Sequence, residues 1–129
     1  MRGVDEPMLT FDNKRIYLAC GHTDMRKSIN GLASIVADSF ELDPFERAAF
    51  AFCNRKRDQI KILEWDTDGF WIHFKRLERG RFRWPDKSSA EETDEKTMTL
   101  SGEEMACLIG SAKLEKKLSR KEIFERKIL

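Results

Sequence analysis

Large apolar side chains recur at every second position along three stretches in the middle of the chain, residues 48–53, 59–65 and 70–75. Alternation with a period of two is typical of strands that bury one face of a sheet. Turn-forming residues separate these stretches at 54–58 and 66–69, as expected for strands joined by short connections. The pattern therefore predicts a small, mainly antiparallel sheet.

A helical period follows a short β-prone stretch at residues 15–20 and begins at about residue 24. Its apolar positions, three to four residues apart, are Met25, Ile29, Leu32, Val36 and Phe40. Such a stripe predicts an amphipathic helix over about 24–39 that packs on one face of the sheet. We expect that face to carry Phe50, Phe52, Ile60, Ile62, Phe70, Ile72 and Phe74. The opposite face is then predicted to carry Lys61, Leu63, Trp65, Trp71, His73 and Lys75. The predicted fold class is α+β, with one helix on one face.

The composition changes after Pro85, because residues 86–97 contain no large apolar side chain. This segment is predicted to be a charged, flexible linker. Residues 101–104 have the sequence Ser-Gly-Glu-Glu, a capping-box pattern that predicts the start of a short helix. We therefore expect an α+β domain over 1–85, a linker over 86–97 and a helical C-terminal segment over 98–129.

The 129 residues include 24 Lys and Arg against 23 Asp and Glu, so the net charge of +1 predicts no partner by itself. No apolar run is long enough to cross a membrane, and the first residues lack the pattern of a secretory signal. A cytoplasmic protein is therefore expected. Its three cysteines, Cys20, Cys53 and Cys107, are widely spaced and odd in number. They are predicted to be buried, reduced thiols rather than a disulfide framework.

The charges are not evenly distributed. Residues 75–83 hold five cations and one glutamate, and arginines with interleaved rings suit phosphate backbones and stacked bases. The candidate phosphate contacts are Arg55, Lys56, Arg57, Lys75, Arg76, Arg79, Arg81 and Arg83. The candidate aromatic contact platform comprises Trp71, His73 and Trp84. The alternative interpretation is that these cations only keep a strand end in solution.

The sequence gives no positive support for catalysis. The candidate catalytic carboxylates are the acids nearest to predicted elements, Asp24, Glu64, Asp66 and Asp68. Asp66 and Asp68, however, belong to an Asp-x-Asp-Gly turn, and such turns are common for reasons of local hydrogen bonding. The cysteines and histidines lack zinc-ligand spacing, and no phosphate-binding loop or nucleophile elbow is present. We therefore predict no catalytic residue, no metal site and no cofactor, and a small metal-dependent nuclease is disfavoured.

Several short motifs follow one another along the predicted domain. The first half contains Ile16-Tyr17-Leu18, Thr23-Asp24-Met25-Arg26-Lys27, Asn30-Gly31-Leu32 and Asp43-Pro44-Phe45. The second half contains Ile60-Lys61-Ile62-Leu63, Trp65-Asp66, Asp68-Gly69-Phe70, Lys75-Arg76-Leu77-Glu78-Arg79-Gly80-Arg81-Phe82 and Trp84-Pro85. In these motifs the chain resembles the TnpB-type accessory proteins of insertion-sequence family sixty-six, over roughly residues 15–85 and, weakly, 98–110.

This resemblance implies a bacterial mobile-element protein, encoded beside a separate transposase that carries the catalytic acids. The function expected from it is that of a non-catalytic accessory factor in DNA transposition, which binds DNA, the transposase, or both. The alternative is a protein-interaction module that docks on the transposase and has no DNA affinity of its own. The expected partners are the transposase and DNA at the element ends, with no membrane and no small-molecule substrate.

Overall fold

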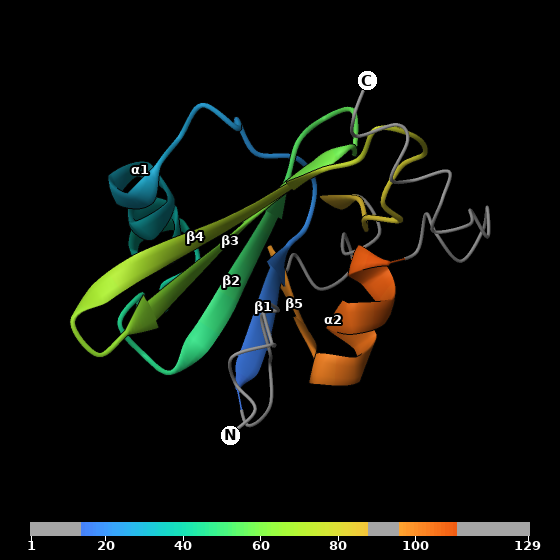
Figure 1. Cartoon of the computed structure of the whole chain (residues 1–129). Helices are drawn as coiled ribbons and strands as arrows, with labels where there is room; N and C mark the ends of the chain where they lie inside the picture. Colours follow the sequence, from blue (N-terminus) through green and yellow to red (C-terminus); the bar gives the residue numbers. More distant parts are fainter. Residues whose placement is uncertain (1–13, 88–95, 111–129) are drawn as a thin grey trace.

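Five strands form a single sheet with helices on both of its faces in the computed structural model, which describes residues 14–87 and 96–110 (Figure 1). In chain order the elements are β1 (Arg15–Ala19), α1 (Ile29–Ser34), η2 (Ile35–Ser39), β2 (Ala48–Cys53), β3 (Gln59–Asp66), β4 (Gly69–Arg76), β5 (Thr97–Leu100) and α2 (Gly102–Ile109). The element η2 is a π-helical continuation of α1. The strand order across the sheet is β4-β3-β2-β1-β5.

The sheet is mostly antiparallel, and only β1 and β2 pair in parallel. A parallel pair needs a crossover connection, which here runs through α1 and η2. The strands β3 and β4 form a hairpin in which Asp66 pairs with Gly69. These features confirm the predicted α+β fold.

The first helix begins later than its apolar periodicity predicts, at Ile29 rather than at about residue 24. The Asp24 carboxylate accepts a 2.9 Å hydrogen bond from the backbone N–H of Arg26. Such local bonds between a side chain and the backbone compete with helical ones. Residues 24–28 therefore form a loop, whereas Leu32 and Val36 are buried as the stripe predicts.

Two cores lie on opposite faces of the sheet. On the α1 face, Leu32 and Val36 pack against Phe50, Phe52 and Leu63. The cluster on the other face consists of Ile16, Leu18, Ala49, Ala51, Cys53, Ile60, Ile62, Phe82, Trp84 and Met105. Figure 1 shows α1 and α2 on opposite sides of the sheet, in keeping with these two clusters.

The predicted placement of Ile60 and Ile62 under α1 is wrong. Phe50 pairs with Leu63, and directly paired residues point to the same face. The α1 face of β3 therefore carries Lys61, Leu63 and Trp65, so these residues do not share a face with Trp71, His73 and Lys75 as expected. A shift of one residue in register moves every side chain of a strand to the other face. Phe74 does lie on the α1 face, but it is 54% exposed instead of buried.

The second described segment, residues 96–110, extends the same sheet and covers its second face. The strand β5 pairs antiparallel with β1, with Met98 opposite Leu18, and Met105 of α2 is buried in the core. The capping box is confirmed, because Ser101 Oγ accepts from the Glu104 N–H at 3.0 Å and the Glu104 carboxylate accepts from the Ser101 N–H at 2.8 Å. Residues 88–95 and 111–129 lie outside the described residues, so the proposed domain boundaries remain predictions.

The three cysteines are free thiols in different surroundings. Cys53 is buried, and this burial raises the pKa of its thiol to about 12. Cys107 is exposed, so the prediction of burial is wrong for this residue, which lies on the part of α2 that faces away from the core. None of the described helices is long and apolar enough to cross a membrane.

Candidate nucleic-acid interface

Three connecting segments meet at one end of the sheet: residues 20–28, 54–58 and 75–87. The parallel strands β1 and β2 both end here, β3 begins here and β4 ends here. Two backbone hydrogen bonds join the first segment to its neighbours, from the N–H of Thr23 to the carbonyl of Cys53 at 2.8 Å and from the N–H of Gly21 to the carbonyl of Pro85 at 3.0 Å. We call this region the basic end.

The turn at 54–58 is organised by Asn54. Its side-chain oxygen accepts hydrogen bonds of 3.0 Å from the backbone N–H groups of Asp58 and Gln59, and its amide donates to the Asp58 carboxylate at 2.7 Å. Arg57 adopts a left-handed backbone conformation with φ of 65°. These bonds define a tight turn with Arg55 and Lys56 exposed.

The segment after β4 is attached to this turn by its backbone. The N–H of Leu77 donates to the carbonyl of Asp58 and the N–H of Phe82 donates to the carbonyl of Arg57, both at 2.7 Å. The Phe82 side chain is buried in the second core. The four residues between these anchors therefore bulge from the surface and carry Arg79 and Arg81, both exposed.

Positive charge dominates the basic end. Its three segments contain eleven cations, Arg26, Lys27, Arg55, Lys56, Arg57, Lys75, Arg76, Arg79, Arg81, Arg83 and Lys87. The carboxylates in the same segments are Asp24, Asp58, Glu78 and Asp86, which leaves a net charge of +7. At the opposite end, residues 14–15, 43–47 and 64–68 hold three cations and five carboxylates, a net charge of −2. Within the described part of the chain, the charge is thus polarised along the strands.

Only some of these cations are neutralised within the described part of the chain. Arg57 forms an ion pair with Asp86, and Arg76 forms one with Glu78 at 2.9 Å. Six exposed cations form no ion pair or side-chain hydrogen bond with another described residue, namely Lys27, Arg55, Lys56, Arg79, Arg81 and Lys87. The structure therefore brings together the two groups of cations that the sequence analysis selected from separate segments.

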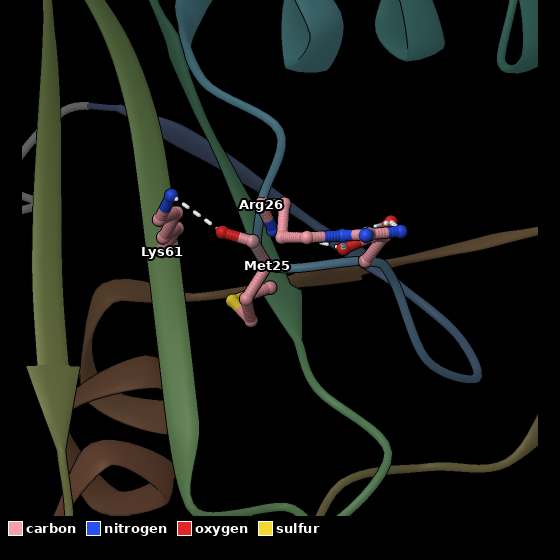
Figure 2. Close-up of polar contacts among 4 residues, drawn as sticks. Met25, Arg26 and Lys61 are labelled. Atoms are coloured by element: carbon pink, nitrogen blue, oxygen red, sulfur yellow. Dashed lines mark hydrogen bonds and ion pairs between the residues drawn. The ribbon is translucent and has the colours of Figure 1, made fainter.

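The loop at 20–28 adds Arg26 and Lys27, which were not among the predicted contacts. Figure 2 shows the Lys61 ammonium directed at the carbonyl of Met25, and Arg26 beside an acceptor carboxylate. Lys61 Nζ donates to the carbonyls of Met25 at 2.8 Å and Lys27 at 2.9 Å. The guanidinium of Arg26 is held by Asp24, with a closest distance of 2.8 Å, although its side chain remains 91% exposed. The signal for these two cations was the Thr-Asp-Met-Arg-Lys motif.

The Arg26 side chain and backbone both donate to Asp24, and these hydrogen bonds hold the pKa of that carboxyl well below its usual range. Asp24 therefore stays ionised and keeps Arg26 in place. This carboxylate thus serves as an anchor for the Arg26 cation. Among residues 14–87 and 96–110, no three His, Cys, Asp or Glu side chains are grouped to hold a metal ion.

The predicted aromatic platform does not form as one surface. Trp84 is only 4% exposed, and its indole N–H donates to the carbonyl of Ala19 at 2.8 Å. Its assignment as a contact residue is wrong, because the segment after β4 folds over the sheet and carries this ring into the core. Trp71 is 56% exposed and stacks on His73 with 6.1 Å between ring centroids. Its indole N–H donates to Asp66 at 3.2 Å, towards the end opposite the basic one.

His73 belongs to a small polar cluster on the same face of the hairpin. Its Nε2 lies 3.0 Å from the Glu64 carboxylate, which also pairs with Lys14. The pKa of His73 is lowered from its ordinary value of 6.5, mainly by burial. The nearby Lys14 ammonium has a smaller effect in the same direction. A neutral His73 donates its Nε2 proton to Glu64, which fixes the ring against Trp71.

The match to a known family covers most of the chain. The family model described as IS66 Orf2 like protein matches residues 14–119. The chain belongs to this family. IS66 Orf2-like proteins are accessory proteins associated with insertion sequences.

Two relatives of this IS66 Orf2-like protein come from Sinorhizobium fredii and are described as the uncharacterized proteins y4hO and y4jC. The first is 40% identical over 73 residues, which are 57% of this chain and 64% of the relative. The second is 32% identical over 71 residues, which are 55% of this chain and 61% of the relative. The aligned part thus spans less than two thirds of either relative. No solved structure matches the chain.

Two stretches that carry the resemblance to IS66 Orf2-like proteins, residues 23–27 and 75–82, lie far apart in the sequence and both reach the basic end. The first stretch contributes Arg26 and Lys27. The second contributes four cations, Lys75, Arg76, Arg79 and Arg81. The geometry therefore connects the family motifs with one charged surface.

Proposed function

We propose that this IS66 Orf2-like protein is a non-catalytic accessory factor in transposition whose basic end binds the phosphate backbone of DNA. The proposal is supported chiefly by the convergence of three segments that present a net charge of +7, including six exposed cations whose side chains have no ion pair or hydrogen bond among the described residues. Catalysis is assigned to a separate transposase. The cytoplasmic location and the lack of a small-molecule substrate remain predictions from the sequence.

Phosphate is the DNA group best matched to this surface. Guanidinium groups form paired, charge-assisted hydrogen bonds with phosphate oxygens. Arg79 and Arg81 lie on a bulge whose two ends are fixed to the turn at 54–58, so little ordering is needed when they bind. Contacts of this type position a protein on DNA without specifying a base sequence. We therefore expect similar affinity for unrelated duplexes.

The test is a fluorescence anisotropy titration of a labelled element-end duplex at several salt concentrations, with the full chain and no transposase. Each neutralised phosphate contributes about −0.9 to the slope of log K against log salt. Arg79→Ala and Arg81→Ala are each expected to reduce the magnitude of that slope by up to about one unit, because each removes one phosphate contact. Arg47→Ala is the matched control, because Arg47 is an exposed arginine at the opposite end, and it is expected to leave the slope unchanged.

A flat titration of the unmodified protein at low salt would contradict DNA binding. An equal loss in Arg47→Ala and Arg81→Ala would contradict the assignment to the basic end. Incubation of the same protein with DNA and Mg²⁺ or Mn²⁺ tests the non-catalytic part of the proposal, for which no cleavage or joining is expected.

A second candidate function, docking on the transposase, is favoured by an aromatic cluster at the opposite end of the sheet. Phe45 is 56% exposed, and its ring lies 5.0 Å from Trp65 and 5.3 Å from Phe70 between centroids. Exposed rings of this kind are enriched where proteins bind one another. Phe45→Ala is expected to weaken capture of the transposase and to leave the DNA titration unchanged, whereas Arg81→Ala is expected to do the reverse.

A further inference from the structure

The strand β4 is an edge of the sheet, and its outer side pairs with no other described strand (Figure 1). It is eight residues long, twice the length of β5 at the other edge. Edge strands present unpaired N–H and C=O groups, and proteins usually protect them with charges, prolines, bulges or a short length. From Gly69 to Phe74 this strand carries no charged residue and no proline.

Two large side chains of β4 are also exposed to solvent. Trp71 is 56% exposed and Phe74 is 54% exposed. They lie on opposite faces of the sheet, because residues three apart on a strand alternate in direction. An edge that is uncharged over residues 69–74 and flanked by exposed rings on both faces has the features of a strand-pairing surface.

We propose that β4 pairs antiparallel with β4 of a second copy of the chain, about a two-fold axis at Ile72. The two five-stranded sheets then form one continuous sheet of ten strands. A two-fold contact of this kind uses the same surface on both copies. The strand that pairs with β4 comes from a second copy of the chain, because β4 is complementary to itself in both its rings and its charges.

The rings match in this register. With Ile72 opposite itself, Phe70 of one copy lies opposite Phe74 of the other, and Trp71 lies opposite His73. Each of these pairs occurs twice by symmetry. Aromatic pairs directly opposite one another are among the favourable cross-strand combinations. The exposed rings of one copy are therefore covered by rings of the other.

The charges match as well. Antiparallel pairing brings the basic end of one copy beside the hairpin turn of the other, and places Arg76 opposite Asp68. A register centred on His73 instead places Asp68 opposite Glu78, two like charges, and Arg76 opposite Phe70. Because like charges directly opposite one another are unfavourable, the register centred on Ile72 is the one assigned.

The test is sedimentation equilibrium of the full chain without DNA, so its outcome does not depend on the proposed DNA binding. The mass is expected to rise from one chain to two as the concentration increases. Phe74→Lys replaces the ring opposite Phe70 with a charged side chain, twice by symmetry, and is expected to raise the dimer dissociation constant about tenfold or more. Met98→Lys is the matched control, because Met98 is an exposed apolar residue on the other edge strand.

The register is tested by exchanging charges. Asp68→Lys and Arg76→Asp are each expected to weaken the dimer, and the double variant is expected to restore it, because the opposite charges are again paired. Circular dichroism establishes that every variant is folded. A folded chain that stays monomeric at all concentrations overturns the proposal, as does a dimer that Phe74→Lys leaves unchanged. A monomer that captures the transposase through β4 likewise overturns it, since the occupant is then a different protein.

Discussion

The backbone N–H of Phe82 donates a 2.7 Å hydrogen bond to the carbonyl of Arg57, although 25 positions separate the two residues in the chain. This bond joins the turn before β3 to the segment after β4. Phe82 is buried in the core, while the Arg57 side chain reaches Asp86 at the surface. One contact thus ties the basic segment after β4 to the turn that precedes β3.

The backbone conformation of Arg57 is expected to lower the free energy of unfolding of the protein. Its φ of 65° lies in the left-handed region, which costs about 1–2 kcal/mol for most residues and less for asparagine. Arg57→Asn relieves this strain and removes a surface ion pair worth about 0–1 kcal/mol. We expect its free energy of unfolding in urea to equal or exceed that of the parent, while its DNA affinity falls.

The matched control for that change is Arg55→Asn, at an exposed neighbour whose φ is not positive. It is expected to weaken DNA binding similarly without a gain in stability. Lower stability of Arg57→Asn than of Arg55→Asn would argue against stored strain at this position.

Lys61→Met tests the anchor of the loop at 20–28. The Lys61 ammonium donates to two carbonyls, of Met25 and Lys27, and the loss of such charged hydrogen bonds is expected to cost about 1–2 kcal/mol. Hydrogen exchange of the backbone amides in the loop is expected to accelerate. Lys56→Met removes an exposed lysine without such contacts, and its change is expected to stay within about 0.5 kcal/mol. Equal effects of the two substitutions would refute the anchor.

The two tryptophans on the predicted platform are expected to respond differently to replacement by phenylalanine. Trp84→Phe leaves the buried carbonyl of Ala19 without its donor, which is expected to cost about 1–3 kcal/mol. Trp71→Phe removes only an exposed bond to Asp66 and is expected to cost less than about 1 kcal/mol. Urea denaturation of both variants measures the difference, and a larger loss in Trp71→Phe would be incompatible with the described core.

His73 is expected to make stability depend on pH. Because burial lowers its pKa in the folded state below 6.5, the unfolded chain binds the proton more readily as the pH falls through about 6.5. The free energy of unfolding is therefore expected to decrease from neutral pH towards the folded-state pKa. His73→Gln, which retains a donor for Glu64, is expected to remove this part of the dependence.

The control is His22→Gln, which replaces the other histidine of the chain at an exposed position and keeps His73 in place. Urea denaturation curves at a series of pH values give the comparison. If His73→Gln and the parent lose stability in parallel over this range, another group is responsible.

The positions of β1 to β4 were predictable because alternation and turn residues are local signals, whereas β5 lies where the sequence predicted the end of a linker and the start of a helical segment. The hairpin of β3 and β4 and the capping box at Ser101 depend on neighbours within a few residues, and so does the cluster of cations after His73. The family resemblance was also accessible, since its motifs are contiguous. For these features the sequence contains the physical cause within one short window.

The faces and the site required the tertiary structure. Ile62 and Leu63 exchange faces if the strand register shifts by one residue, and register is decided by pairing with a distant strand. Trp84 was assigned to the surface because nothing local shows that its segment folds back to reach Ala19. Likewise, the contact between Arg57 and Phe82 joins segments whose local patterns are independent. Local sequence therefore determined that β1 to β4 and the two helices form and where cations cluster, whereas long-range hydrogen bonds and packing decided that β5 joins the sheet, which side chains are buried and which charges share a surface.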